Sequence, residues 1–344
     1  MIRRTIVVAL LLLAGFVAET RGNTILNGAG ATFPAPLYAK WFEVYQQKKD
    51  VRIAYQKVGS GEGLRQILAR SVDFGASDAF LTDEELERHG NALIHIPTCL
   101  GAVAVIYNLP GDPGLKLTPE ALADIYQGRI TSWADRRIGA DNPKSRLPDQ
   151  KIAVVSRLDG SGTTFIFTDY LSKVSPSWRA SVGRGKKVTW PAGMRVAKNE
   201  GVADMVASVP GSIGYVSLNY AVSRSLPVLA LRNRSGYYIK PTLASVSAAG
   251  DLDLQSDARV MITDTPAPGG YPISAFTYLL VYREQAYDQR ERTKAEAMRD
   301  LLRWMVHEGQ LYAPALEYAP LPGRVVANTE RLLERMTYEG APLQ

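Results

Sequence analysis

Residues 28–36 read Gly-Ala-Gly-Ala-Thr-Phe-Pro-Ala-Pro, a run of small residues that stands just before a helical pattern. The apolar side chains of that pattern recur at i, i+4, i+7 and i+8 and so share one helix face: Leu37, Trp41, Val44 and Tyr45. The first N–H groups of a helix have no partner inside it and carry the positive end of its dipole, and glycine lets a ligand approach the backbone closely. We therefore expect this turn to be able to cradle an anion.

Two further turns have the same character. Residues 59–61 read Gly-Ser-Gly and precede a helical pattern formed by Leu64, Ile67 and Leu68. Residues 159–164 read Asp-Gly-Ser-Gly-Thr-Thr and precede another helix. A single turn of this kind usually does no more than cap its helix. Three in one chain favour an anion site, and four hydroxyls would add donors to it: those of Thr32, Ser60, Ser161 and Thr163.

Two charged residues stand beside these turns. Arg157 ends the apolar run that leads into residues 159–164, and its guanidinium offers a fork of donors suited to an oxyanion; the alternative is an ordinary surface arginine. Asp78 ends residues 72–78, and a carboxylate in an anion site would repel the ligand. Its alternative role is to cap the helix that we expect to start near Thr82.

Short apolar runs alternate with helical patterns along the chain, which is typical of an α/β fold. The runs that we expect to be strands are Ile53 to Tyr55, Ile94 to Ile96, Val103 to Tyr107, Ile152 to Val155, Ile213 to Val216 and Leu279 to Tyr282. The stretch from Ser235 to Gly270 loses apolar periodicity and is rich in Ser, Ala, Asp, Pro and Gly. We expect a long surface excursion there.

The N-terminus has the pattern of a secretory signal. A short basic region with Arg3 and Arg4 precedes an apolar stretch from Thr5 to Ala18, and we expect a signal peptide over residues 1–22 with cleavage between residues 18 and 23. A lipid anchor would need a cysteine at the cleavage point, whereas the one cysteine is Cys99. We therefore expect a free, exported chain without a disulfide, with Cys99 as a small buried apolar residue.

The composition fits a globular protein. Of 344 residues, 22% are charged and 46% hydrophobic, and the length allows two domains. After the predicted signal, no run approaches the roughly 18 apolar residues that a membrane-spanning helix needs. The formal charge is +6, and about +4 without the arginines of the signal. We interpret the basic groups at Arg136-Arg137 and residues 184–187 as solvated loop charge, and expect no nucleic-acid partner.

Motifs of catalysis are missing from the sequence. The phosphate loop G-x-x-x-x-G-K-[ST] fails because Lys187 follows Gly185 and Lys186, and the G-x-S-x-G elbow fails because Asp159 and Thr163 flank Ser161. The three histidines lie in unrelated contexts without ligand-like spacing, and we expect structural roles for all of them: His89, His95 and His307. The sequence therefore predicts no enzyme, no metal and no cofactor.

Residues 28–36, 72–78 and 159–163 resemble the signatures of the periplasmic phosphate-binding proteins of phosphate-specific ABC importers, the PstS family. The resemblance covers nearly all of the chain after the signal, because it extends through residues 188–191, 199–202, 210–216 and 271–274. It implies a type II periplasmic binding protein with two lobes, each a mixed β-sheet flanked by helices, and phosphate in the cleft between them. The implied partners are phosphate and the permease subunits of the transporter, and the implied state is a periplasmic monomer.

The resemblance also implies boundaries and contacts. The chain would cross between the lobes near Thr98 and Pro272, so that lobe I comprises residues 23–98 and 273–344 and lobe II residues 99–272. By position in the matching motifs, the phosphate ligands would be Thr32, Phe33 through its backbone N–H, Ser60, Asp78, Arg157, Ser161, Gly162 and Thr163. Asp159 would orient Arg157.

A proton on the ligand resolves the difficulty with Asp78. Phosphate near neutral pH can donate a hydrogen bond to this carboxylate, whereas sulfate has no proton to give and would meet repulsion. Arsenate keeps a similar proton and would not be strongly rejected. Glu62 departs from the family pattern of small uncharged residues, and we expect it to point to solvent. The alternatives are a receptor for sulfate or molybdate, or a weak secreted phosphomonoesterase.

Overall fold

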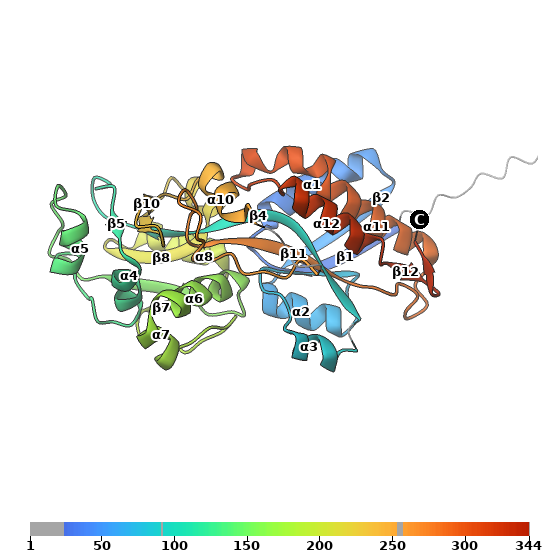
Figure 1. Ribbon diagram of the computed structural model, residues 1–344, viewed down its shortest axis with the longest axis horizontal. Helices are drawn as coiled ribbons and strands as arrows, with labels where there is room; N and C mark the ends of the chain where they lie inside the picture. Colours follow the sequence, from blue (N-terminus) through green and yellow to red (C-terminus); the bar gives the residue numbers. More distant parts are fainter. Residues whose placement is uncertain (1–23, 91, 253–256, 344) are drawn as a thin grey trace, which may run out of the picture.

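The computed structural model describes residues 24–90, 92–252 and 257–343. Its elements form two groups side by side: the first group contains both ends of the described chain, and the second group contains its middle. The long strands β4 (Leu93–Tyr107) and β11 (Ser274–Tyr282) run from one group into the other (Figure 1). The predicted signal peptide lies outside the described residues. Among the described helices, none is long and apolar enough to cross a bilayer.

The strands are β1 (Thr24–Gly30), β2 (Val51–Lys57), β3 (Phe74–Ser77), β4 (Leu93–Tyr107), β5 (Lys116–Leu117), β6 (Ala153–Arg157), β7 (Met194–Val196), β8 (Ser212–Ser217), β9 (Ala230–Arg232), β10 (Tyr238–Ile239), β11 (Ser274–Tyr282), β12 (Thr337–Tyr338) and β13 (Ala341–Pro342). The helices are α1 (Ala35–Lys48), α2 (Ser60–Leu68), α3 (Asp83–Arg88), α4 (Pro119–Tyr126), α5 (Arg136–Asp141), α6 (Gly162–Val174), α7 (Pro176–Ser181), α8 (Lys198–Ser208), α9 (Leu218–Val222), α10 (Leu243–Gly250), α11 (Arg292–Val306) and α12 (Gly323–Leu333), with two short 3₁₀ helices at Glu308–Tyr312 and Pro314–Leu316.

The largest sheet has eight strands in the order β2-β1-β3-β11-β4-β8-β6-β7. Strand β1 runs parallel to β2 and β3, β11 pairs antiparallel with β3 and β4, and β4 pairs antiparallel with β8. Strand β6 lies parallel to both β8 and β7. This mixed sheet with helices around it confirms the predicted α/β class.

Strand β4 corrects the expectation of two separate strands at Ile94 to Ile96 and Val103 to Tyr107. It is one strand of 15 residues, all of them buried. It stays continuous because β11 supplies its hydrogen-bond partners along the first part and β8 along the second. The pairing shifts once: Cys99 lies opposite Thr277 and Pro97 opposite Tyr278, so Thr98 is the extra residue of a β-bulge.

The predicted helix faces are buried. On α1 the four residues of the apolar pattern all face the core: Leu37, Trp41, Val44 and Tyr45. On α2, Ile67 is fully buried, and Leu64 and Leu68 pack beside it. Cys99 is fully buried, as expected.

The region from Ser235 to Gly270 is more ordered than its composition suggests. Its described part contains β10 and the helix α10, and Thr242 caps this helix in a reciprocal pair with Ser245. The small residues of α10 allow close packing on β4, and a Cβ added at Gly250 would lie 2.2 Å from Leu100. The prediction of a surface excursion is therefore wrong for this helix, because small residues here serve close packing rather than a loop.

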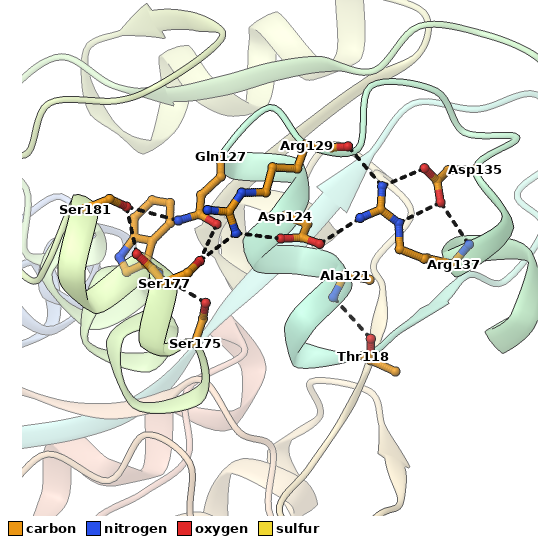
Figure 2. A network of polar contacts seen from close by, with 11 residues as sticks. Thr118, Ala121, Asp124, Gln127, Arg129, Asp135, Arg137, Ser175, Ser177 and Ser181 are labelled. Carbon is orange, nitrogen blue, oxygen red and sulfur yellow. Dashed lines mark hydrogen bonds and ion pairs between the residues drawn. The ribbon is translucent and has the colours of Figure 1, made fainter.

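A polar network ties α4, α5 and α7 together at the outer end of the second group (Figure 2). Asp124 binds Arg137 at 2.9 Å and Arg129 at 3.4 Å, and Arg129 reaches Ser177 at 2.7 Å. Because Arg129 and Arg137 are about half exposed, each pair contributes little to stability. Arg136 and Arg137 are both exposed, as expected, but they form the first turn of α5, so the prediction that they lie in a loop is wrong.

Asp73 joins three elements of the first group. Its carboxylate accepts the N–H of Asn27 at 2.7 Å, contacts Lys294 Nζ at 2.9 Å and pairs with Arg290. Asp73 and Arg290 are both buried, so this ion pair is shielded from water. Removing one partner of such a pair leaves an uncompensated buried charge.

We expect Asp73→Ala to lower the free energy of unfolding by about 3 to 5 kcal/mol, because it leaves Arg290 buried without its carboxylate. The matched control is Glu84→Ala, which breaks an exposed i,i+4 pair with Arg88 and should cost less than about 0.5 kcal/mol. Urea unfolding of both variants measures the difference. Equal costs would contradict a structural role for the buried pair.

Candidate anion-binding site

The three small-residue turns meet in space. The first turn ends β1 and starts α1, Gly59 precedes α2, and Ser161 precedes α6. The N–H of Gly61 donates to the carbonyl of Gly160 at 2.9 Å, which joins the second turn to the third. Asn199 Nδ2 joins the first to the third, because it lies 2.8 Å from Thr32 Oγ1 and 3.2 Å from Thr163 Oγ1.

The predicted ligand residues all lie in this buried junction. All eight are buried: Thr32, Phe33, Ser60, Asp78, Arg157, Ser161, Gly162 and Thr163. A Cβ added at Gly162 would lie 2.3 Å from Asp78 Oδ2 and 2.4 Å from Ser60 Oγ. Glycine is therefore required there, and the start of α6 closes directly onto the end of β3.

The helix starts leave donors available. The caps of α1 and α2, Pro34 and Gly59, make no side-chain hydrogen bond to their helices. Ser161 does cap α6, because its Oγ accepts the N–H of Thr164 at 3.0 Å. A hydroxyl that accepts one hydrogen bond can still donate its own proton, so Ser161 can cap the helix and bind an anion together.

Arg157 is a buried site residue, and the surface alternative is wrong. Its guanidinium makes two bonds to Asp159, from Nε to Oδ1 at 2.7 Å and from Nη2 to Oδ2 at 2.5 Å. Its remaining nitrogen, Nη1, is buried and has no hydrogen-bond partner among the described residues. Burial opposes ionisation of Asp159, but the hydrogen bonds and charge of Arg157 outweigh it and lower the pKa of this carboxyl. Asp159 is thus positioned to orient the arginine.

Asp78 is also buried, and it does not cap α3. The cap of α3 is Thr82, which forms a capping box with Glu85. Asp78 Oδ1 instead accepts the hydroxyl of Thr277 at 2.6 Å, while Oδ2 lies 3.4 Å from Ser60 Oγ. Burial raises the pKa of Asp78 to about 7, although Thr277, Arg157 and Ser60 all act in the opposite direction.

Four residues of the site were not among the predicted ligands: Asn199, Tyr220, Thr277 and Tyr318. Tyr220 donates to the carbonyl of Thr32 at 2.7 Å, and Tyr318 donates to that of Phe33 at 2.5 Å. Because the C=O and N–H of one peptide point in opposite directions, the bond to Thr32 sets the direction of the Phe33 N–H. Asn199 occurs in one of the matching motifs, but no local pattern in the sequence indicates that its side chain reaches the turns.

Comparison with known proteins identifies the family. A model of the PBP superfamily domain matches residues 17–308. The phosphate-binding protein PstS of Pasteurella multocida (strain Pm70) is 39% identical over 331 residues, which cover 95% of this chain and 94% of that protein. The phosphate-binding protein PstS of Xylella fastidiosa (strain 9a5c) is 41% identical over 318 residues, covering 91% and 86%. The chain belongs to the PstS family.

Solved structures agree on the fold. A high-affinity periplasmic phosphate-binding protein bound with phosphate superposes with a TM-score of 0.73 at 23% identity, over 90% of this chain and 93% of that one. A phosphate ABC transporter substrate-binding protein from Clostridium perfringens, described as putative and with bound phosphate, gives 0.63 at 20% identity, over 87% and 100%. These likenesses confirm the predicted architecture, a two-lobed type II periplasmic binding protein.

Glu62 is the departure of this PstS-family chain from the expected pattern, and it points out of the site. Its carboxylate bonds Arg65 at 2.5 and 2.8 Å and Gln66 at 2.8 Å, all on its own helix. The hydrogen bonds from Arg65 and Gln66 lower the pKa of Glu62 to about 2. The expectation of an outward placement is confirmed, and the charge of Glu62 is balanced at the surface by Arg65.

The described histidines have structural partners. His95 is buried and its Nε2 accepts the N–H of Leu81 at 3.0 Å, and burial lowers its pKa to about 3. His307 contacts Glu330 at 2.9 Å, and His89 follows the last turn of α3. Within residues 24–90, 92–252 and 257–343, no group of three or more His, Cys, Asp or Glu residues could hold a metal ion.

We expect Asp78→Asn to stabilise the protein in oxyanion-free buffer at about pH 8 by as much as roughly 4 kcal/mol. The pKa of Asp78 in the folded protein, about 7, lies above its ordinary value of 3.8, so the folded state binds the proton more tightly. The ionised carboxyl therefore destabilises the fold fully above pH 7, and this effect fades as the pH falls toward 4.

Urea unfolding at about pH 8 and pH 5 measures this effect, since the gain should shrink at the lower pH. Asp50→Asn is the control, because Asp50 is exposed and its replacement should change little at either pH. A gain in the free energy of unfolding that is equal at both pH values, or a loss at pH 8, would contradict the raised pKa of Asp78 in the folded protein.

Proposed function

We propose that this protein binds inorganic phosphate where the three turns meet and delivers it to the permease of an ABC importer. One observation carries the proposal: the same closed junction contains the buried carboxylate of Asp78 and a buried guanidinium nitrogen of Arg157 that has no hydrogen-bond partner in the part of the chain that the structure describes. The guanidinium supplies charge for an anion, and the carboxylate accepts a proton from it. The names of the relatives, which are phosphate-binding proteins at 39% and 41% identity, support the same ligand.

Each predicted ligand has a role in this proposal. Arg157 binds phosphate oxygens through its guanidinium while Asp159 holds it in place. The hydroxyls and N–H groups of the turns supply neutral donors: Thr32, Phe33, Ser60, Ser161, Gly162 and Thr163. Asp78 accepts the hydrogen bond of the protonated phosphate oxygen. Such neutral donors fix the anion's position without adding net charge.

Asp78 sets the choice among tetrahedral oxyanions. At neutral pH, sulfate and molybdate carry no proton that could pair with an ionised carboxylate, so their binding would place two negative oxygens together. Phosphate avoids this repulsion, and arsenate avoids it in the same way. The ligand is therefore a hydrogen-bearing oxyanion, of which phosphate is the one named in the relatives.

Closure of two lobes would enclose the ligand. We assign residues 23–98 and 273–344 to lobe I and residues 99–272 to lobe II, with crossings at the β4 bulge and at the start of β11. The bulge at Thr98 supports the first crossing, and the contacts of Asn199 and Tyr220 with the first turn support a closed form. The protein acts outside the cytoplasm as a monomer, and its signal peptide directs its export.

Binding involves no bond chemistry in this proposal. The named relatives are binding proteins, which supports this view over a secreted phosphomonoesterase. Release of product from a chromogenic phosphate ester, with the release lost in Arg157→Ala, would overturn it.

We expect Arg157→Ala to weaken phosphate binding at least about 100-fold, because hydrogen bonds from a charged donor contribute about 1.5 to 3 kcal/mol each. Ser60→Ala removes one hydroxyl and should cost less, about 10-fold. Arg136→Ala is the matched control, since Arg136 is exposed on α5 and should leave affinity unchanged. Calorimetric titration of the purified proteins measures all three. Wild-type affinity in Arg157→Ala would contradict the proposed site.

A further inference from the structure

Thr277 lies beside Asp78 although the two are far apart in the sequence. Strand β11 pairs antiparallel with β3, and Tyr278 lies opposite Ser77. Thr277, which precedes Tyr278, therefore lies close to Asp78, which follows Ser77. Thr277 is fully buried and its hydroxyl donates to Asp78 Oδ1 at 2.6 Å. None of the expected ligand roles includes this threonine.

The β-bulge holds Thr277 in place. Its backbone carbonyl accepts the hydroxyl of Thr98, the extra residue of the bulge, at 3.3 Å. The same Thr98 oxygen lies 2.8 Å from the hydroxyl of Tyr38 on α1. Bulges next to binding sites redirect side chains, and this one connects the position of Thr277 to both β4 and α1.

The two oxygens of Asp78 therefore have different surroundings. Thr277 occupies Oδ1, whereas Oδ2 faces Ser60 Oγ at 3.4 Å and the start of α6 at Gly162. Ser60 and Gly162 are both among the expected phosphate ligands, so Oδ2 is the oxygen turned toward the ligand. A carboxylate free to rotate would not keep this distinction.

We propose that Thr277 is a specificity-determining positioning residue: its hydroxyl holds Asp78 Oδ1 so that Oδ2 serves as the acceptor for the proton of the bound oxyanion. This inference rests on the proposed function and deepens it. Thr277 would not touch the bound oxyanion itself, but it would set the preference of the site for oxyanions that carry a hydrogen. Loss of the hydroxyl would free the carboxyl to rotate and to keep its own proton. A protonated carboxyl can donate a hydrogen bond, and an oxygen of sulfate can accept this bond as readily as an oxygen of phosphate.

The surroundings of Asp78 leave it as the group whose charge changes near neutral pH. The titratable neighbours from the other packed elements are Tyr38, Tyr55, Cys99, Tyr220 and Tyr318, and burial raises the pKa of each of them, so they stay neutral. Arg157 is the charged group that acts on Asp78. Its partner Asp159 stays ionised, because its pKa is lowered. The hydrogen bond from Thr277 opposes the effect of burial on the pKa of Asp78.

The test compares Thr277→Val, which removes the hydroxyl at nearly constant volume, with Thr277→Ser, which keeps it. Phosphate and sulfate are titrated into each variant and into the wild type from about pH 6 to pH 8.5. We expect the ratio of phosphate to sulfate affinity at about pH 8 to fall about 10-fold or more in Thr277→Val and to stay within about 3-fold in Thr277→Ser. Sulfate binding should also appear at a higher pH in Thr277→Val than in the wild type.

Thr329→Val is the matched control, because it removes a fully buried threonine hydroxyl on α12 that donates to the carbonyl of Val325 and contacts neither Asp78 nor Thr277. It should leave the ratio and its pH profile unchanged. If Thr277→Val does not fold, Thr277→Ala is titrated in its place. An unaltered ratio, or equal losses for both anions, overturns the inference while phosphate binding by the wild type preserves the proposed function. Failure of the wild type to bind phosphate overturns the proposed function itself.

Discussion

The site depends on two opposite charges, those of Arg157 and Asp78, which are buried close together and which each form hydrogen bonds with a partner of their own. Arg157 is bound by Asp159, and Asp78 by Thr277. Burial disfavours the ionised form of Asp78, which a ligand carrying both negative charge and a proton can restore. In the proposed site, this junction is therefore complementary to a hydrogen-bearing oxyanion, and each of the three turns would contribute uncharged donors around that pair.

Strand β4 makes this arrangement possible, because it belongs to both groups of elements. It is buried along all 15 residues and pairs with β11 and then β8. Its bulge at Thr98 lies beside Thr277, so the place where the strand changes register is also the place that positions the carboxylate. The residues that position this carboxylate therefore lie on the strands that join the two groups of elements.

The sequence predicted the parts of the site that are local. The three turns and Arg157 follow from residues adjacent in the chain, and so does the α/β class, whereas the orienting role of Asp159 was implied by the family resemblance. Thr277, Tyr220 and Tyr318 reach the turns only through strand pairing and packing over long sequence separations, so no periodicity could indicate them. The continuity of β4 was missed because Pro97 and Gly101 interrupt the apolar pattern, and α10 because its small residues imitate a loop.

Calorimetric titration of the wild-type protein with phosphate and with sulfate in parallel tests the central claim most directly. The mature chain is first stripped of any carried-over anion, and both titrations are made at physiological salt and about pH 8.5, where the carboxyl of Asp78 is ionised. The account predicts tight binding of one phosphate per chain and sulfate binding that is weaker by about 10-fold or more. Sulfate binding comparable to that of phosphate would contradict the role of Asp78, and silence toward both anions would contradict the anion site as a whole.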